Sequence, residues 1–458
     1  MRLVLGFLLI VSLNALAVPL PPAVLRELKS AGIPLSATGI SVREIGAQKA
    51  AISINAEQPM NPASTMKLFT TFAGLELLGP AYTWKTEAYL DGKLENGVLQ
   101  GDLILKGYGD PKFTIEQFWL WMAELRARGL REIRGNLVLD HSFFDLPPID
   151  SGAFDNDPVR AYNVTPDALL LNFNTLRLRY IPEGNHLRVI IEPMLEGVRL
   201  DSQLAPQAGS CEDWDDTIHV QANDERILLQ GGYPASCGER EHNLRLLSHS
   251  RYVDTVFRAV WHQLGGSLSG IQRDGSLNAG ARLYSTHRSE PLSLIIRDIN
   301  KFSNNVMARQ LFLTLGATTA TDIPRSSAAM RDWLKTKGLA FPELVLENGA
   351  GLSRLERISA EHMAQLLQSV TTSPYSAELI ASLPILGIDG SVKKRLKNSP
   401  AASHAHLKTG TLDGVKTLAG YVQAQSGKPW SVVFFINHPN AKRAQPAQDA
   451  LIEWLQGQ

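Results

Sequence analysis

The chain has 458 residues, of which 44% are hydrophobic and 20% are charged. A chain of this length exceeds the size of one simple hydrophobic core, so we expect two or three domains. The 45 basic and 45 acidic side chains cancel to a formal net charge of zero. This balance argues against a protein that binds nucleic acid or an anionic membrane through excess positive charge.

Residues 1–17 have the pattern of a secretory signal peptide. Arg2 precedes an apolar run from Leu3 to Leu13, and Ala15-Leu16-Ala17 fits a cleavage site. The alternative is a membrane anchor, but the apolar run is shorter than the about 20 residues that span a bilayer. We therefore expect a periplasmic protein with no integral membrane segment after cleavage.

The chain has two cysteines, Cys211 and Cys237. In an oxidising compartment such a pair predicts a disulfide, with two unpaired thiols as the alternative. No histidine cluster surrounds either cysteine, which disfavours a metal site or a cysteine nucleophile. We expect no metal and no other cofactor.

The N-terminal region mixes helix and strand patterns. Residues 22–29 predict a short helix, and residues 37–45 and 50–55 alternate like a pair of strands. Another helix is expected to begin at Ser64 and to stop at Gly79-Pro80.

The remaining chain divides into a β-rich stretch and a helical stretch with closing strands. Short β-like runs alternate with turns up to about residue 282, interrupted by a predicted helix over 251–264. Helices return after Pro291, and the last elements predicted are three strands and a helix, over 404–409, 417–424, 430–437 and 446–455. The pattern predicts an α+β fold in which a domain of helices and antiparallel sheet is interrupted by a β-rich insertion.

These changes in pattern predict the domain boundaries. The first part of the helix-and-sheet domain is expected over 18–84, and its second part over 283–458. The insertion is expected over 85–282, with an inner domain at about 165–250.

The first motif that carries chemistry is Ser64-Thr65-Met66-Lys67, at a predicted helix start. Positions i and i+3 share one helix face, so the Lys67 amine can reach the Ser64 hydroxyl. A serine becomes a good nucleophile when a base takes its proton, and a lysine with a lowered pKa is such a base. The same S-x-x-K spacing recurs from Ser391 to Lys394, which we interpret as a solvated run of charges because only basic residues follow.

Two further motifs follow in the second half of the chain. Ser303-Asn304-Asn305 lies between two predicted helices, and Lys408-Thr409-Gly410 ends a predicted strand and is followed by Thr411. Each motif alone also fits an ordinary structural role, as a helix cap or as a strand end with a turn glycine.

Together, in the order S-x-x-K, S-x-N and K-T-G, the motifs resemble the signature of penicillin-binding proteins and serine β-lactamases. The long separation of the first two motifs is similar to that of the low-molecular-mass class C penicillin-binding proteins, the D-alanyl-D-alanine carboxypeptidase/endopeptidase family, which carry domains inserted there. Other matching stretches span nearly all of the mature chain: Gly107-Tyr108-Gly109-Asp110-Pro111, Asn300-Lys301-Phe302-Ser303, Glu347 to Arg354, and Gly387-Ile388-Asp389-Gly390. Tyr108, Asn348 and Ala350 depart from the family pattern, and none of them belongs to the catalytic motifs.

The resemblance implies a transpeptidase-like fold, an acyl-enzyme on Ser64 and covalent inhibition by β-lactams, with peptidoglycan stem peptides and cross-links as substrates. Lys67 is then the base, Ser303 and Lys408 relay protons to the leaving amine, and Asn305 holds the substrate amide. The K-T-G motif binds substrate, with Thr409 on its terminal carboxylate, Gly410 beside it, and the backbone N–H of Thr411 joining that of Ser64 in the oxyanion hole.

Two alternatives are a serine β-lactamase and a non-catalytic wall-binding protein on the same fold. A β-lactamase needs a deacylating base, and no E-x-x-x-N-type segment follows the first motif. A scaffold is disfavoured because both Ser64 and Lys67 are present.

A cross-linking stem peptide carries a diamino acid with an amine and a carboxylate at its far end. Reading that group requires an acid and a guanidinium beside the cleft. We expect Arg354 to supply the guanidinium and Asp157 the acid, with Tyr162 as an aromatic wall. The alternatives are a surface arginine and a surface turn.

Overall fold

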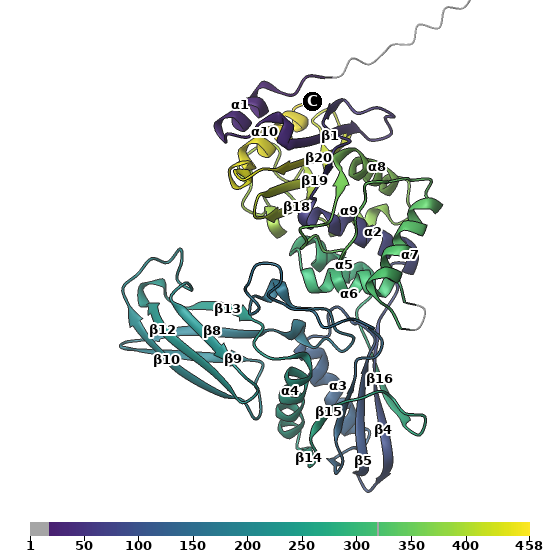
Figure 1. Cartoon of the computed structure of the whole chain (residues 1–458), viewed down its shortest axis with the longest axis vertical. Coiled ribbons are helices and arrows are strands. Elements are labelled where there is room, and N and C mark those ends of the chain that lie inside the picture. The colour runs from purple at the N-terminus through teal and green to yellow at the C-terminus, as the bar shows by residue number, and fades with distance from the viewer. Residues whose placement is uncertain (1–17, 318–319) are drawn as a thin grey trace, which may run out of the picture.

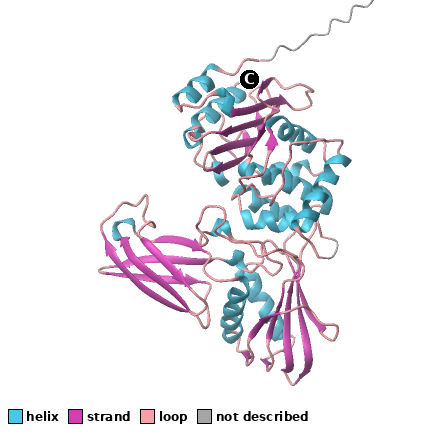
Figure 2. Ribbon diagram, in the orientation of Figure 1, coloured by secondary structure: helices cyan, strands magenta, loops and turns pink. Residues whose placement is uncertain are grey.

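The structure of the protein is a computed structural model, and it describes residues 18–317 and 320–458. The predicted signal peptide, residues 1–17, lies outside the described residues. Figures 1 and 2 show a body of helices around a sheet, from which a second body rich in strands extends. The described residues contain no helix that is long and apolar enough to cross a membrane.

The sheet of the body joins the two ends of the described chain. It is antiparallel, has the order β18-β19-β20-β1-β2, and consists of β1 (Thr38–Glu44), β2 (Ile52–Ile54), β18 (Ala405–Leu412), β19 (Val415–Gln423) and β20 (Pro429–Asn437). Both faces of this sheet are buried. Phe434 and Ile436 pack into one hydrophobic cluster, whereas Val433 and Phe435 pack into another, as alternate strand residues must when both faces are covered.

Helices cover the two faces of the sheet. One face carries α1 (Pro22–Ser30) and α10 (Gln445–Gln456), whose apolar residues share a cluster with the sheet. The other carries α2 (Met66–Leu78), α5 (Leu292–Lys301), α6 (Asn305–Leu315), α7 (Ile323–Thr336), α8 (Ala360–Thr371) and α9 (Ser376–Ser382). Residues 66–75 of α2 are all buried, as expected for a helix surrounded by others. A short ladder pairs β3 (Pro59–Met60) with β17 (Ile358–Ser359).

The insertion begins with a second sheet. This sheet has the order β14-β6-β5-β4-β16, with β7 also paired to β5, and β15 paired to β7. Its strands are β4 (Lys85–Glu95), β5 (Val98–Gly107), β6 (Glu132–Ile133), β7 (Leu137–Asp140), β14 (Ser267–Leu268), β15 (Gln272–Asp274) and β16 (Arg282–Arg288), and it shares a core with α3 (Ile115–Ala127) and α4 (His249–Gln263). The predicted boundary at residue 282 falls on the first residue of β16. Because β16 pairs with β4, the sheet of the insertion extends to Arg288.

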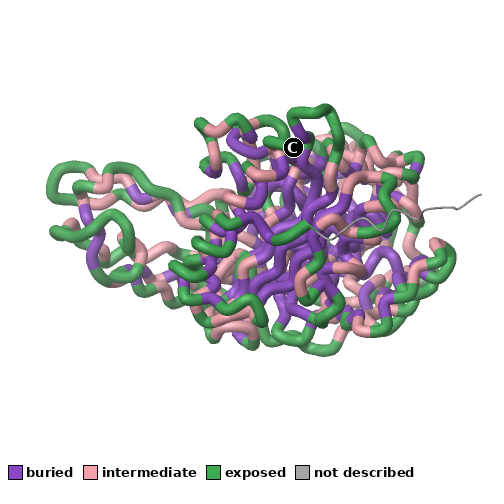
Figure 3. Tube along the Cα trace, turned by 90° about the horizontal axis from the view of Figure 1, so that it is seen from above, coloured by how far each residue is buried: buried purple, intermediate pink, exposed green. Residues whose placement is uncertain are grey.

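The inner part of the insertion consists of two three-stranded sheets, β13-β8-β9 and β10-β12-β11. The strands are β8 (Leu176–Glu183), β9 (His186–Glu192), β10 (Arg199–Gln207), β11 (Ile218–Ala222), β12 (Arg226–Pro234) and β13 (Arg240–Leu244). Tyr180 of one sheet stacks on Tyr233 of the other, with 5.7 Å between ring centres. No residue of β9 or β10 is fully buried, and this part forms the thin, largely exposed arm in Figure 3.

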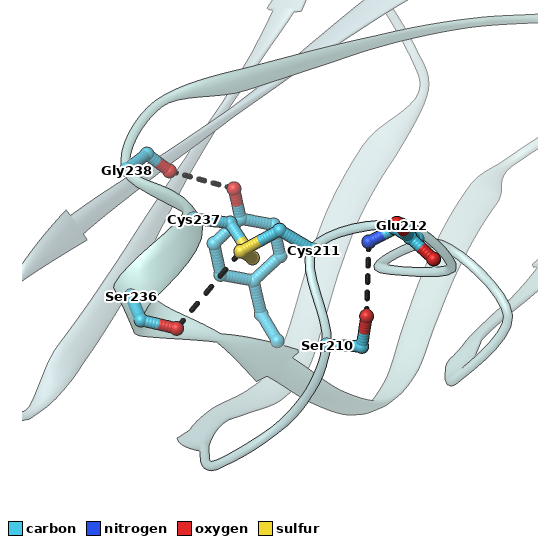
Figure 4. The surroundings of a disulfide bond; sticks show 7 residues. Ser210, Cys211, Glu212, Ser236, Cys237 and Gly238 are labelled. Carbon is cyan, nitrogen blue, oxygen red and sulfur yellow. Dashed lines mark hydrogen bonds between the residues drawn. A yellow bond between two sulfur atoms is a disulfide. The ribbon is translucent and has the colours of Figure 1, made fainter.

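A disulfide joins Cys211 to Cys237, as the sequence predicted. It connects the loop after β10 to a short 3₁₀ turn, Ala235–Cys237, after β12 (Figure 4). The bond therefore closes a loop within the inner part of the insertion.

The predicted α+β fold is confirmed. The antiparallel sheet, its flanking helices and the β-rich insertion between α2 and α5 all occur in the expected order.

Candidate active site

Ser64 lies in a tightly held turn at the start of α2. The turn is a 3₁₀ helix, Ala63–Thr65, that leads directly into α2. The Asn61 side chain accepts a hydrogen bond from Ala63 N–H at 2.9 Å and donates one to the Ser353 carbonyl at 2.8 Å. In the turn and the first helical turn, residues 61–67, Ser64 alone is not fully buried. The fold thus fixes the backbone around one accessible hydroxyl.

The Lys67 amine is buried against the Ser64 hydroxyl. Its Nζ lies 2.9 Å from Ser64 Oγ, 2.7 Å from Asn305 Oδ1 and 2.5 Å from the Ala350 carbonyl oxygen. Burial, followed by the positive charge of Lys408, holds the pKa of Lys67 well below its usual value. A neutral amine has two N–H groups and one lone pair. Asn305 and Ala350 accept the two N–H groups, so the lone pair is directed at the Ser64 proton.

Lys408 and Ser303 form a second hydroxyl–amine pair. Lys408 Nζ donates to Ser303 Oγ at 2.8 Å and to the Thr409 carbonyl at 2.9 Å. Burial lowers the pKa of Lys408 to about 7. Ser303 occupies the turn between α5 and α6 with φ of 58°, and the next residue, Asn304, caps α6 by accepting from Met307 N–H.

Strand β18 passes directly beside the nucleophile. A Cβ atom at Gly410 would lie 2.2 Å from Thr417 Oγ1 and 2.8 Å from the Ser64 backbone nitrogen. Only glycine allows this approach. Lys408 and Gly410 are buried, whereas Thr409 is half-buried and Thr411 is exposed, so the strand presents two threonines at the edge of the site.

The structure corrects our interpretation of the segment from Ser391 to Lys394. Lys393 and Lys394 are exposed, as a solvated charge run requires. Ser391, however, lies 2.8 Å from Thr409, hydroxyl to hydroxyl. The signal was the preceding stretch from Gly387 to Gly390, which matches the family and should have drawn attention to the residue that follows it.

An ion pair between the buried Lys301 and the half-buried Asp389 holds the turn that carries Ser391. Lys301 Nζ donates to Asp389 Oδ2 at 2.6 Å and to the Leu383 carbonyl at 2.9 Å. Lys301 is the last residue of α5, two positions before Ser303. The ion pair thereby fixes the turn that carries Ser391 to the segment that carries Ser303.

The loop that supplies the Ala350 carbonyl is organised by Glu356. The buried Glu356 Oε1 accepts backbone N–H groups from Glu347, Asn348 and Gly349 at 3.1, 2.9 and 3.0 Å. Burial raises the pKa of Glu356. No sequence pattern pointed to this residue, because its role depends on the folded loop.

Arg354 lies beside Phe154 and the turn that follows β18. Its guanidinium is 4.6 Å from the Phe154 ring centre, and its Nη1 donates to the Asp413 carbonyl at 3.1 Å, just beyond β18. A cavity of about 360 Å³ is lined by Arg354 and Phe154. Phe154 also packs on a hydrophobic cluster that includes Ala63, the residue before Ser64. Through Phe154, Arg354 is therefore linked to the turn that carries Ser64.

The structure places Tyr162 at the site but pairs it with a different acid. The Tyr162 carbonyl accepts from Asn305 Nδ2 at 3.2 Å, and the Tyr162 hydroxyl donates to Asp155 Oδ2 at 2.6 Å. Asp157 Oδ2 instead accepts from Arg160 Nε at 2.7 Å. Despite burial, the hydrogen bonds from Tyr162 and Asn163 lower the pKa of Asp155. Sequence reasoning chose Asp157, whereas Asp155 of the same run is the acid that contacts Tyr162.

No group of three His, Cys, Asp or Glu side chains arranged to hold a metal ion occurs within residues 18–317 and 320–458.

Comparison with known proteins identifies the family. The family described as "D-Ala-D-Ala carboxypeptidase 3 (S13)" matches residues 24–458. The chain is 27% identical over 421 residues to the D-alanyl-D-alanine carboxypeptidase DacB of Haemophilus influenzae, a match that covers 88% of this chain and 85% of that protein. It is also 27% identical over 421 residues to the D-alanyl-D-alanine carboxypeptidase of an Actinomadura species, covering 85% and 76%.

A solved structure shares the fold. The crystal structure of penicillin binding protein 4 from Haemophilus influenzae superimposes with a TM-score of 0.78 at 24% identity, covering 94% of this chain and 99% of that one. The family match over nearly the whole described chain and the arrangement of the three motifs lead to one conclusion: the chain belongs to the D-Ala-D-Ala carboxypeptidase 3 (S13) family, the low-molecular-mass class C penicillin-binding proteins.

Proposed function

We propose that the protein is an exported, periplasmic serine D-alanyl-D-alanine carboxypeptidase and endopeptidase that acts on peptidoglycan through an acyl-enzyme on Ser64. The observation that carries this proposal is the set of three short contacts of Lys67 Nζ, which direct its lone pair at the Ser64 hydroxyl. Family membership and the names of the relatives support the choice of substrate.

The acylation step follows from this geometry. Ser64 Oγ attacks the carbonyl carbon of the penultimate D-alanine while its proton passes to Lys67 Nζ. The carbonyl oxygen becomes an oxyanion between the backbone N–H groups of Ser64 and Thr411. The close approach of Gly410 to the Ser64 nitrogen supports this placement of the two donors.

The second hydroxyl–amine pair serves the leaving group. When the C–N bond breaks, the departing amine takes a proton from the Ser303 hydroxyl, which regains one from Lys408. The Lys408 pKa of about 7 suits a group that gives and regains a proton near neutral pH. Water then cleaves the ester and regenerates Ser64. Asn305 holds the substrate amide, and Thr409 binds the terminal carboxylate.

The side chain of a diamino acid in the stem peptide fits between Arg354 and Tyr162. Arg354 supplies the guanidinium for its carboxylate, and Asp155 the acid for its amine. We assign the acid to Asp155 in place of Asp157, because the Asp157 carboxylate already pairs with Arg160.

The test uses radiolabelled or fluorescent penicillin and mass spectrometry of the labelled peptide. The expected result is one label, on Ser64, that is lost in Ser64→Ala. Incubation of the purified protein with isolated peptidoglycan should release D-alanine and convert cross-linked muropeptides to monomers. Label retained on Ser64→Ala would contradict the proposal, and rapid turnover of a cephalosporin without peptidoglycan cleavage would favour a β-lactamase.

A further inference from the structure

A groove of about 780 Å³ leads from the proposed active site onto the insertion. One end is the turn from Phe302 to Asn305, which includes two proposed catalytic residues. The walls come from α3, α4 and the ends of β8 and β9, elements that Figure 1 shows gathered below α6. The groove is thus continuous with the site and built mostly by the insertion.

The groove is larger than the release of one terminal D-alanine requires. A terminal D-alanine is a single small residue, and release of that residue needs no wall on the insertion. A cross-link, by contrast, continues beyond the scissile bond into a second stem peptide and its sugars. The size of the groove therefore fits the endopeptidase substrate better than the carboxypeptidase substrate.

Exposed apolar side chains line this groove. Trp119, Tyr162, Met194 and Phe302 are 38%, 44%, 63% and 67% exposed and all face the groove. Such a concentration of exposed apolar surface marks a binding site. Aromatic rings beside amide side chains suit a ligand with apolar faces and polar edges. Away from the Phe302–Asn305 turn, the amides are those of Asn172, Asn243 and Gln263.

The charges in the groove favour an uncharged part of the second arm there over an anionic part. Its one arginine, Arg177, lies 3.8 Å from Glu192 and 3.9 Å from Glu241, so its charge is compensated. Glu116 adds a further negative charge to the wall. An uncharged N-acetylated sugar meets no repulsion here, and its ring presents C–H groups to an aromatic face.

We propose that this groove binds the second arm of a cross-linked substrate, with a sugar ring of that arm lying against Trp119. The inference rests on the proposed function. It names the part of the substrate that the insertion recognises.

The test compares three substrates: a cross-linked muropeptide dimer with its disaccharides, the same dimer after removal of the sugars, and a monomeric pentapeptide. Trp119→Ala should lower kcat/KM on the sugar-bearing dimer at least about fivefold, the loss expected for one good interface contact. Activity on the pentapeptide and acylation by penicillin should change far less. Leu120→Ala is the matched control, because Leu120 is the next residue of α3 and is 64% exposed but does not line the groove.

Two results would overturn the proposal. Equal losses on dimer and pentapeptide would mean that Trp119 supports the fold, and an equal loss on the sugar-free dimer would mean that it contacts no sugar. Failure of the proposed function is a distinct result, because the wild-type protein would then neither bind penicillin on Ser64 nor cleave any of the three substrates.

A second inference concerns Ser391. Its hydroxyl lies 2.8 Å from that of Thr409, on a turn fixed by the Lys301–Asp389 pair. The geometry points to Ser391 as a positioning residue that orients the Thr409 hydroxyl toward the substrate carboxylate. This inference also rests on the proposed role of Thr409.

The readout separates binding from chemistry. Ser391→Ala should raise KM for a D-Ala-D-Ala peptide about five- to tenfold, the effect of one hydrogen bond, with kcat little changed. Ser391→Thr, which keeps the hydroxyl, should restore KM. A fall in kcat at constant KM, or no rescue by threonine, would show that Ser391 does not act through Thr409.

Discussion

At the residue scale, the site depends on two buried lysines with different tasks. Burial lowers the pKa of both amines. Lys408 falls to about 7 and so still carries a proton part of the time near neutral pH, whereas the pKa of Lys67 is held well below its usual value, because the positive charge of Lys408 adds to the effect of burial. Lys67 contacts Ser64, whereas Lys408 contacts Ser303. In the proposed mechanism, placing each amine on its own hydroxyl separates the base that activates Ser64 from the acid that serves the leaving group.

Replacing Lys67 by alanine removes the base but leaves the nucleophile in place. Lys67→Ala should fold and should be acylated by penicillin at least about a hundredfold more slowly, the usual contribution of a general base. Stopped-flow acylation kinetics, with circular dichroism to check the fold, measure this loss. Near-normal acylation would show that another group takes the Ser64 proton.

Arg354 is exposed, rests on Phe154 and makes one hydrogen bond to a backbone carbonyl, so its replacement should spare the fold. Arg354→Ala should lower kcat/KM about tenfold or more on peptides that contain meso-diaminopimelate, because a charge-assisted hydrogen bond contributes about 1.5–3 kcal/mol. Penicillin lacks that group, so its acylation rate serves as the internal control. Equal losses on both substrates would mean that Arg354 does not recognise the diamino acid.

The residues that sequence predicted belong to local motifs, and those it missed do not. Ser64 and Lys67 are one helical turn apart, so their contact follows from spacing alone. Ser391 and Glu356 act through contacts with distant or folded segments, Thr409 and the loop at residues 347–349. Sequence reasoning did not choose Asp155, because Asp155 and Asp157 offer the same chemistry two positions apart and only the folded loop distinguishes them.

At the element scale, hydrophobic periodicity predicted the helices and strands that are buried on one face or on all sides. The strand pair β1–β2 and the helices α1, α2 and α4 were found within a few residues of the predicted ranges, because their apolar patterns are regular. The pairing of β1 with β20 was not predictable, since it joins opposite ends of the chain. The half-exposed strands β9 and β10 give only a weak alternating pattern.

The disulfide is an element-scale constraint that lies apart from the proposed chemistry. It closes a loop with a sequence separation of 26 residues, and loss of such a crosslink costs about 3 kcal/mol in the chain-entropy model. Mild reduction should lower the melting temperature of the protein. Penicillin acylation of the protein that stays folded should keep its rate, measured on the same sample. A parallel loss of acylation would show that the inner sheets support the active site.

At the scale of the whole molecule, the insertion is anchored to the body near Asp167. The buried Gln310 of α6 accepts a hydrogen bond from the Asp167 backbone N–H at 3.1 Å and donates one to the Asp167 carbonyl at 2.8 Å. The Asp167 side chain in turn binds His141, just beyond β7, at 2.6 Å. Sequence showed that an insertion exists, but contacts of this kind, between segments about 140 residues apart, leave no local pattern.

This junction makes stability depend on pH through His141. Burial opposes the charged imidazole, but hydrogen bonds to Asp167 and Asp274 raise the pKa of His141 to about 10, and the nearby His249 does not reverse this effect. A group whose pKa is raised in the folded state contributes its full stabilisation below its unfolded pKa, which is near 6.5 for histidine. That contribution to the free energy of unfolding is lost as the pH rises toward the folded pKa of about 10. The free energy of unfolding should therefore fall between pH 7 and 10, by at most about 1.4 kcal/mol per pH unit.

His141→Gln keeps a hydrogen-bond donor for Asp167 but removes the titrating group. Urea unfolding of both proteins from pH 6 to pH 10 isolates the contribution of His141, since all other ionisable groups are shared. The variant should be less stable at pH 6, and the difference should shrink as pH rises, because the wild-type imidazolium loses its proton. Two parallel stability curves would show that His141 carries no charge at this junction. Convergence near pH 10 would mean that an ion pair between the insertion's own sheet and its anchoring loop helps to hold the groove wall against the body.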